Sequence, residues 1–474
     1  MKRFLKVIPC LLLALVMVVA AVGCSYKRPG DTTEEVKYTI NFDLPASTKT
    51  TIKVLIPDDE YERKIMNALI AGFNQKYPLI EVKINTLTID RYNTVVFQQS
   101  QAGILADIVW TNSSNFYFLI SNGISLNLNQ FIEQGTQAGV FNYETDFNSD
   151  FKGMGMLGEN RYAIPRSIDS VVCFYNKEIL EKAGADMSLV RDGWTWDDFL
   201  TICESVRNFY DTTSDSDYKN SQFYPVDANL TWESVAYPII KSLGGEVLNE
   251  NGEFALTKEK SDEVVAFVKE LVDKRYVATK NTSQSSFESG TGALYFQSTS
   301  IDKLYNKASL VDQIDETTKV PKFDVVSFPL INGESSVIGN GIAGYAMNKA
   351  TASDQTKLDA SAAFLAYLMS YDGQQKVALD GGLNLPSIRS DLSIENPEAN
   401  WHKQYSASFN MEAYLWGSEY KMGLPFLADT KPEFTSGIVN AMNTYVGAYA
   451  LQETADTAYN LFKGEVQDVF NSIV

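Results

Sequence analysis

Acidic side chains at two places in the chain are of a type that could hydrolyse a glycoside or bind sugar hydroxyls. Asp58, Asp59 and Glu60 directly follow a strand-like run, and Asp169 lies in a short polar segment between two others. Many glycosidases work with two carboxylates alone, one of them as general acid. Carboxylates also accept hydrogen bonds from hydroxyl groups. The separation of these groups in space decides between catalysis and binding, and the sequence does not give it.

The patterns of several other sites are missing or incomplete. Two glycine triplets, beginning at Gly153 and Gly339, match the dinucleotide fingerprint by letter. Neither leads into a helix whose N-terminus would face a pyrophosphate. The one histidine, His402, cannot form a multi-histidine metal site, and we interpret it as a surface residue. We therefore expect no metal and no cofactor.

Three tryptophans stand where loops or helix ends are expected. Trp110 ends a strand before a polar loop, Trp232 starts a helix, and Trp416 lies beside Tyr414 and Tyr420. Aromatic faces in such places suit stacking on the apolar faces of sugar rings. Core packing explains each tryptophan equally well when it is taken alone.

The segment Arg161–Gly184 is the one around which the other elements are arranged. Strand-like pieces at Tyr162–Ile164 and Val171–Tyr175 are joined by a polar stretch and followed by a helix. Asn176 can cap that helix, and Gly184 suits the left-handed position just past its end. The two pieces could form a hairpin or a crossing between domains. We favour the crossing because α/β patterns lie on both sides of it. Arg166 and Asp169 would then lie where two lobes meet, a common place for a ligand.

The patterns before the crossing indicate a β-α-β unit. A strand at Thr51–Ile56 is followed by an amphipathic helix and by a second strand at Ile80–Ile84, most simply parallel to the first. Beyond the crossing, Thr195 and Asp198 have the spacing of an N-terminal helix cap.

The second half of the chain contains further strands and then helices. Ala293–Phe296 is a candidate second crossing strand, and Phe323–Phe328 and Gly344–Met347 are expected to return to the first domain. Leu358–Ser370 is a strongly apolar helix, and the remainder is mostly helical.

The N-terminus has the features of an export signal. Lys2, Arg3 and Lys6 precede the apolar run Leu11–Val22, which is too short to span a bilayer comfortably. The residues ending at Cys24, AVGC, resemble a bacterial lipobox. We expect cleavage after residue 23 and lipidation of Cys24, with a plain secretory signal as the alternative.

The net charge of the chain limits the kinds of partner that it can bind. The net charge is −19, and removal of residues 1–23 with their three basic side chains brings it to about −22. Nucleic acids and anionic lipids require a basic footprint, so both are excluded as partners.

Cys173 and Cys203 lie among apolar neighbours. A disulfide is possible outside the cytoplasm, but we favour two buried free thiols.

Several stretches occur together in the order found in one known family. They are ADIVW (106–110), YAIP (162–165) with FYNK (174–177), TWDDF (195–199), GGEVLN (244–249), 287–295, and 362–374 followed by LP (385–386). On these stretches the mature portion resembles family 1 extracellular solute-binding proteins, the sugar-binding components of bacterial ABC importers.

The resemblance implies an α/β fold of the two-lobed, periplasmic-binding-protein-like kind (type II). Its lobes are joined by crossing strands, with a central ligand cleft. We divide the chain into a signal peptide (1–23), a tether (24–49), lobe 1 (50–165 and 294–352) and lobe 2 (166–293 and the helical part 353–474).

The resemblance and the residue types together give a set of candidate ligand contacts. In the wall of the first lobe they are Asp58, Asp59, Glu60, Tyr61, Trp110, Asn112, Ser113 and Asn340; elsewhere they are Arg166, Asp169, Trp232, Ser298, Asn384 and Trp416. Sugar binders of the family often have Gly-x-Trp after the second crossing. Here Gln297 and Ser298 follow the strand instead, so one usual stacking platform is missing.

The expected function is therefore capture of a sugar or oligosaccharide by a monomeric, non-enzymatic binding protein. It is lipid-anchored on the outer face of the cell membrane and delivers its ligand to ABC permease subunits. Two alternatives stay open. One is a binding protein for another solute, such as a peptide or a polyamine, for which the acidic turn Asp58–Glu60 would suit a cation. The other is an exported carbohydrate enzyme that uses paired carboxylates.

Overall fold

The computed structural model describes most of the chain beyond the N-terminal segment. The described residues are 36–113, 115–219, 223–249, 254–277, 285–315, 318–341, 343–422, 437, 440–442, 444–447 and 454–471. The expected signal peptide, Cys24 and residues 24–35 of the expected tether lie outside them. Within the described residues, no helix combines the length and apolar character needed to cross a membrane.

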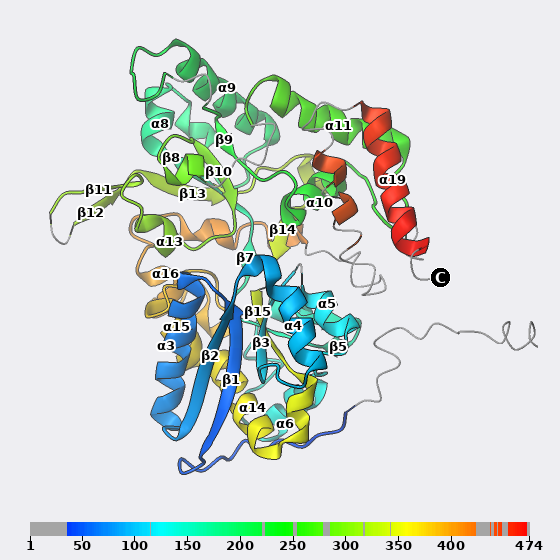
Figure 1. Cartoon of the computed structure of the whole chain (residues 1–474). Coiled ribbons are helices and arrows are strands. Elements are labelled where there is room, and N and C mark those ends of the chain that lie inside the picture. The colour runs from blue at the N-terminus through cyan, green and yellow to red at the C-terminus, as the bar shows by residue number, and fades with distance from the viewer. Residues whose placement is uncertain are drawn as a thin grey trace, which may run out of the picture.

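The first lobe is built on a five-stranded sheet (Figure 1). In sheet order the strands are β2 (Ile80–Leu87), β1 (Thr50–Pro57), β3 (Ile108–Asn112), β15 (Ala343–Met347) and β6 (Ile164–Pro165). The first three are parallel, and β15 runs antiparallel to β3. Its helices include α3 (Glu60–Lys76), α4 (Tyr92–Gln101), α5 (Phe116–Ser121) and α6 (Asn129–Gln137). The predicted β-α-β unit is thus confirmed as β1-α3-β2.

The second lobe contains a four-stranded sheet with helices around it (Figure 1). In sheet order its strands are β13 (Phe323–Ser327), β8 (Val172–Asn176), β10 (Leu294–Gln297) and β9 (Val226–Asp227). The helices include α8 (Lys177–Lys182), α9 (Trp196–Thr212), α10 (Glu233–Ser242), α11 (Lys258–Asp273), α13 (Ile301–Tyr305) and α19 (Ala455–Asn471). A short hairpin, β11 (Val311–Gln313) and β12 (Lys319–Pro321), precedes β13.

The segment Arg161–Gly184 is a crossing and not a hairpin, as predicted. Its strand β6 belongs to the sheet of the first lobe, whereas β8 belongs to the sheet of the second. Between them, β7 (Asp169–Ser170) pairs antiparallel with β14 (Ile338–Gly341). The chain therefore passes between the lobes at β7 and returns at β14.

The assignment of residues 294–352 to the first lobe was wrong for most of that range. Both β10 and β13 pair antiparallel with β8, so they complete the second sheet. The return to the first lobe comes only with β14 and β15. Alternating burial identifies a strand but does not identify the sheet that it joins, because pairing depends on distant partners.

The assignment of residues 353–474 to the second lobe was also wrong in its first part. Helices α14 (Gln355–Met369) and α15 (Tyr371–Leu379) pack against α3, and α14 also packs against β1. The chain crosses once more after α16 (Asn400–Lys403), since the short 3-10 helix η7 (Met411–Tyr414) contacts β13. Helix α19 then packs against α11.

Residues 36–42 were assigned to the tether, with a further strand at Tyr38–Phe42 as an alternative, but they form no strand and are attached to the first lobe. Tyr38 and Ile40 are buried against the first lobe. Their backbone N–H groups donate to the side-chain oxygens of Gln130 (3.0 Å) and Gln134 (2.8 Å) on α6. The chain is therefore attached to the first lobe well before β1.

Local signals in the sequence fared better. Thr195 and Asp198 form a full capping box on α9, and Gly184 has the left-handed φ of 63° expected just past α8. Cys173 and Cys203 are buried free thiols. His402 is not a surface residue: its side chain is only 6% exposed and packs edge-on to Trp401 at 4.8 Å.

Candidate ligand-binding cleft

A cleft of about 650 Å³ lies where the two lobes meet. Its walls come from the end of β1 and the start of α3, from the loop after β2, from the end of β3, from the crossing, and from the segment between β10 and α13. The lining residues are Pro57, Asp58, Asp59, Tyr61, Glu62, Thr88, Ile89, Asp90, Trp110, Asn112, Arg166, Asp169, Gln297, Ser298, Thr299, Ser300, Lys303 and Leu385.

The acidic turn after β1 is engaged in local structure. Asp59 caps α3, with Oδ1 accepting a hydrogen bond from the backbone N–H of Glu62 at 3.0 Å. Asp58 is half-exposed and forms an ion pair with Arg63. Glu60 is exposed and does not line the cleft. Helix capping explains why an acidic cluster occurs at this position.

A buried ion pair in the cleft wall joins the crossing to α3. Glu62, in the first turn of α3, accepts hydrogen bonds from Nη1 of Arg166. Both side chains are almost fully buried. Burial acts to lower the pKa of Arg166, but Glu62, Tyr345 and Asp169 together outweigh it, with Glu62 foremost, and the pKa is raised overall. The pair fixes the guanidinium in its charged form at the boundary between the lobes.

Asp169 is a buried carboxyl at the crossing. It lies on β7, and Oδ1 accepts a hydrogen bond from the Ser167 hydroxyl. Burial raises the pKa of Asp169, although the nearby Arg166 cation opposes the shift. The group is one of the few buried carboxyls that contribute to the cleft wall.

Trp110 forms an aromatic wall at the end of β3. Its ring is 6% exposed and meets Tyr92 edge-on, with centroids 5.7 Å apart. Among the described residues the buried indole N–H has no hydrogen-bond partner. Asn112, two residues further on, is held in a turn in which its Oδ1 accepts from the backbone N–H of Asn115 at 3.1 Å.

Contacts across the cleft connect the two lobes near its floor. Ser300, which follows a strand of the second lobe, donates its hydroxyl hydrogen to the carbonyl of Gly382 in the first lobe at 2.9 Å. Within the first lobe, the Tyr61 hydroxyl donates to the same carbonyl at 3.1 Å. Lys64 of α3 forms an ion pair with Asp302 of α13 at 3.0 Å. These contacts hold the segment before α13 against the first lobe.

Of the fourteen candidate ligand contacts, the cleft brings eight together. They are Asp58, Asp59, Tyr61, Trp110, Asn112, Arg166, Asp169 and Ser298. Their contact with a ligand stays a prediction.

The other six candidates lie outside the cleft lining. Besides Glu60 they are Ser113, Trp232, Asn340, Asn384 and Trp416. Ser113 and Asn340 lie beside the crossing, since Asn340 pairs with Ser170 on β7. The Ser113 Oγ lies 3.7 Å from the position that a Cβ on Gly341 would take.

Asn384, Trp232 and Trp416 are held in other surroundings. Asn384 is 0% exposed, beneath the floor next to Ser300. Trp232 directly precedes α10, which packs against β14. Trp416 stacks on Tyr420 with centroids 5.8 Å apart and does not line the cleft.

Several lining residues were missed by sequence reasoning. Glu62, Asp90 and Lys303 carry charge, and Gln297, Thr299 and Ser300 supply polar groups. Gln297 was considered only because its segment lacks the family's tryptophan, whereas Ser298 was a candidate contact. Because the segment 298–303 follows a strand of the second lobe and touches the first, only the three-dimensional fold shows its position. Within the described residues, no cluster of three or more His, Cys, Asp or Glu side chains is arranged to hold a metal ion.

The fold and the cleft define a class. Two α/β lobes, joined by strands that cross between them and enclosing a polar cleft with an aromatic wall, are the architecture of a periplasmic-type binding protein. The chain belongs to the bacterial extracellular solute-binding protein family, whose model matches residues 68–404. This family is one of binding proteins and not of enzymes, which contradicts the carbohydrate-enzyme alternative.

Individual relatives support this placement. An arabinooligosaccharide-binding protein of Halalkalibacterium halodurans is 27% identical over 211 residues, which cover 43% of this chain and 42% of the relative. The match thus spans less than half the length of that relative.

Solved structures are similar over nearly the whole fold. An ABC substrate-binding protein from Listeria monocytogenes, in complex with cycloalternan, has a TM-score of 0.69 at 18% identity, covering 90% of this chain and 99% of the other. A protein from Mycobacterium tuberculosis in complex with glycerophosphocholine has a TM-score of 0.67 at 15% identity, covering 90% and 99%. At these identities the likeness concerns the fold alone.

Proposed function

We propose that this protein captures a sugar or oligosaccharide in the interlobe cleft and delivers it to the permease of an ABC importer, as a lipid-anchored monomer outside the cell. Family membership supports the binding role. The partial match to an arabinooligosaccharide-binding protein supports a carbohydrate ligand.

The observation that carries the proposal is the combination of groups in the cleft. The Trp110 ring lies in the wall of the first lobe with the carboxylates of Asp58 and Asp59 and the amide of Asn112, and the Gln297 amide comes from the second lobe. An aromatic face suits the apolar face of a sugar ring, and carboxylates and amides bind its hydroxyls. A buried donor without a partner costs about 1–3 kcal/mol. A ligand hydroxyl accepting from the Trp110 N–H would offset that cost.

Closure of the lobes would couple binding to a change of shape. Asp59 and Trp110 belong to the first lobe, whereas Ser298 follows a strand of the second. A ligand that touches both walls binds the closed form better and therefore shifts the population toward it. Hinge closure around a ligand is the motion described for periplasmic binding proteins.

Trp232 belongs to this proposal through closure. Its helix α10 packs against the crossing strand β14, so a rotation at the crossing would move Trp232 relative to the first lobe. We expect Trp232→Ala to weaken sugar binding at least tenfold, or about 1.4 kcal/mol. Titration calorimetry measures this, and unchanged affinity would remove Trp232 from the site.

The lipid anchor is proposed at Cys24. Each buried methylene of an attached chain contributes about 0.8 kcal/mol to membrane binding. Because residues 36–42 are fastened to α6, the anchor would be connected to the first lobe by a short linker. Mass spectrometry of the mature N-terminus, compared with Cys24→Ser, tests lipidation, and light scattering tests the monomeric state.

The ligand class is tested by a thermal-shift screen across a glycan panel that includes arabino- and malto-oligosaccharides. Stoichiometric stabilisation without new products supports the proposal, because a ligand that binds only the folded state raises the melting temperature. Turnover of the glycan, or no shift with any glycan, contradicts it.

A second candidate is a small cationic solute. Asp58, Asp59, Asp90 and Asp169 line the cleft, and a protein of similar fold was solved with glycerophosphocholine, which carries a quaternary ammonium. Polyamines, choline esters and short basic peptides therefore belong in the same screen. Stabilisation by these compounds alone would favour the second candidate over a sugar.

A further inference from the structure

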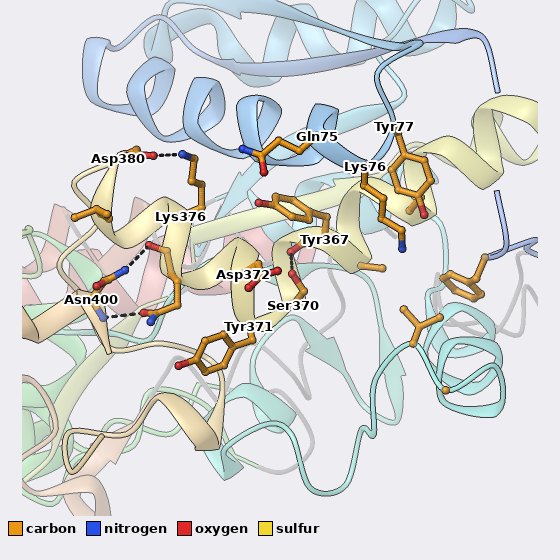
Figure 2. A pocket seen from close by; sticks show the side chains of 18 residues that line it. Gln75, Lys76, Tyr77, Tyr367, Ser370, Tyr371, Asp372, Lys376, Asp380 and Asn400 are labelled. Atoms are coloured by element: carbon orange, nitrogen blue, oxygen red, sulfur yellow. Dashed lines mark hydrogen bonds and ion pairs between the residues drawn. The ribbon is translucent and has the colours of Figure 1, made fainter. Parts of the chain in front are cut away.

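A second hollow lies on the first lobe, away from the cleft. This groove, of about 1110 Å³, runs between α3 on one side and α14 and α15 on the other, and it shares no lining residue with the cleft. Figure 2 shows Gln75 and Lys76 on α3 facing Tyr367 and the start of α15. Family membership gives no role to this part of the surface.

The groove is shaped by small residues on the helices that form it. Gly72 lies within α3, and a Cβ there would come within 1.9 Å of the Tyr367 hydroxyl. A glycine inside a helix costs roughly 0.5–1 kcal/mol relative to alanine. Here it allows the Tyr367 ring to lie across α3. Ala363 and Ala366 leave further space along α14.

Aromatic and aliphatic side chains form an exposed apolar surface in the groove. Tyr371, the first residue of α15, is 37% exposed, while Val140 and Leu379 are 43% and 54% exposed. Tyr77 lies at the other end, with the Lys76 ammonium over its ring at 5.2 Å. Tyrosines supply flat apolar faces together with a hydroxyl.

Polar groups in the groove are of two kinds. Some are fixed within the protein: the Gln375 side chain accepts from the backbone N–H of Asn400 at 2.7 Å, and Lys376 pairs with Asp380. In the part of the chain that the structure describes, the Gln75 amide and the Asp372 carboxylate form no hydrogen bond or ion pair. They are available to a ligand.

The charges that line the groove cancel. Two lysines, Lys76 and Lys376, are matched by two aspartates, Asp372 and Asp380. A phosphate, an anionic lipid or a polyanion would gain little from such a surface. A neutral ligand with many hydroxyls can use both the donors and the acceptors, and its apolar faces can lie on the tyrosines.

We propose that this groove is a second, weaker carbohydrate site, which holds a stretch of neutral glycan on the surface of the first lobe. Tyr371 and Tyr367 supply the stacking faces, and Gln75 and Asp372 bind hydroxyls. The site operates independently of the cleft and does not rest on what the cleft binds. On a long glycan, it would raise the local concentration of chain ends near the first lobe.

The test uses the full mature chain carrying Trp110→Ala, so that binding in the cleft is weakened more than tenfold. Arabinohexaose and maltohexaose are titrated separately, with saturation-transfer NMR for contact and calorimetry for affinity. We expect weak binding of at least one hexasaccharide. Adding Tyr371→Ala should weaken it at least tenfold, whereas Tyr371→Phe should stay within about twofold because the ring face is kept.

Phe97→Ala is the matched control. Phe97 lies on α4, is 39% exposed and does not line the groove. Its replacement should leave the weak binding unchanged. The proposal is overturned if neither hexasaccharide binds the Trp110→Ala protein, or if Tyr371→Ala and Phe97→Ala behave alike. If Tyr371→Ala binds the glycan normally but reduces glycan uptake in cells, the groove contacts a protein partner. That result would also overturn the proposal.

Failure of the cleft proposal would have a different signature. If the wild-type protein binds no glycan tightly, but its weak binding disappears with Tyr371→Ala, the groove site stands and the cleft ligand is another solute. If tight binding is lost with Trp110→Ala and no weak binding is left, the cleft site stands and the groove site falls.

Discussion

The cleft and the groove are both hollows in the same molecule, but they are built differently. The cleft draws its walls from both lobes and from the crossing, and it includes buried charges and a buried indole N–H that has no partner in the described part of the chain. The groove is larger, lies within one lobe, and is formed by the exposed faces of neighbouring helices. Its free polar groups are in contact with water.

The difference shows that volume is a poor guide to the main site. Burying a charged or polar group is costly unless it is paired. Arg166 and Asp169 are only 7% and 8% exposed at the boundary between the lobes. Packing alone does not explain why charged groups are buried there. No such cost is present in the groove. We therefore assign the stronger site to the cleft and the weaker one to the groove.

The largest effect should come from breaking the buried Glu62–Arg166 pair in the cleft wall. Glu62→Ala leaves the Arg166 guanidinium buried without its partner, which typically costs 3–5 kcal/mol. Urea denaturation of the ligand-free protein measures the loss. Arg63→Ala is the control on the same helix, since its pair with Asp58 is half-exposed and should contribute at most about 1 kcal/mol. Equal losses of unfolding free energy in the two variants would mean that the buried pair stabilises the protein no more than the half-exposed pair does.

The next effect is on binding and concerns Trp110. Trp110→Ala should weaken the tight glycan site by more than tenfold, about 1.4 kcal/mol, because both the aromatic face and the indole N–H are removed. Trp110→Phe keeps an aromatic face but lacks the indole N–H, so its glycan affinity should lie between those of Trp110→Ala and the wild type. Calorimetry with the preferred glycan decides. If Trp110→Phe binds as tightly as the wild type, the indole N–H makes no ligand hydrogen bond.

Local features of the fold were predictable from sequence to a large extent. The capping box at Thr195, the cap at Asn176 and the turn at Gly184 depend on a few neighbouring residues, and each was found as expected. The crossing at Arg161–Gly184 was also predicted, because α/β patterns on both sides left little room for a hairpin.

Long-range placement was less predictable. Strand β13 was assigned to the wrong lobe because its pattern fits either sheet, and only pairing with β8 decides. The helix α14 is apolar on nearly every side, so its sequence gives no face that would identify its partners. The buried position of His402 depends in the same way on a neighbouring segment that the local pattern does not specify.

For the site, the sequence identified residues at strand ends and missed those that arrive from elsewhere. Trp110, Asn112 and the turn after β1 lie at the carboxyl ends of parallel strands, where a ligand is expected. Ser300 and Lys303 approach from a segment that is held against the first lobe by contacts to Gly382 and Lys64. Those contacts join residues far apart in the chain and have no local signature.

A smaller effect is expected from Asp169→Asn. Burial raises the pKa of the Asp169 carboxyl, so between its ordinary value and the raised value the native state holds a proton that the unfolded state has released. That contribution to stability is therefore lost as the pH rises through this window. Asn stays neutral, so we expect the variant to melt about 2 °C higher at pH 7 and to show no advantage below the window.

The pH dependence is checked by calorimetric melting of both proteins between pH 3 and pH 8, with the exposed Asp58→Asn as control. A parallel pH profile for Asp169→Asn and the wild type would contradict a raised pKa. Asp372 in the groove is exposed, so Asp372→Asn does not replace a buried carboxyl. That variant should leave the pH profile of the melting temperature unchanged.

The smallest effect concerns coupling between the two hollows. They share no lining residue, and substitutions at separate sites usually add within about 0.3–0.5 kcal/mol. Tyr371→Ala should therefore leave both the melting temperature and the affinity of the cleft for a short sugar nearly unchanged. A double-mutant cycle with Trp110→Ala, measured with a disaccharide, should give a coupling energy inside that range.

With a long glycan able to reach both hollows, the same cycle should depart from additivity, because binding at one site then raises the effective concentration at the other. Coupling with the disaccharide itself would mean that the groove acts on the cleft through the first lobe, and the two sites would no longer be independent.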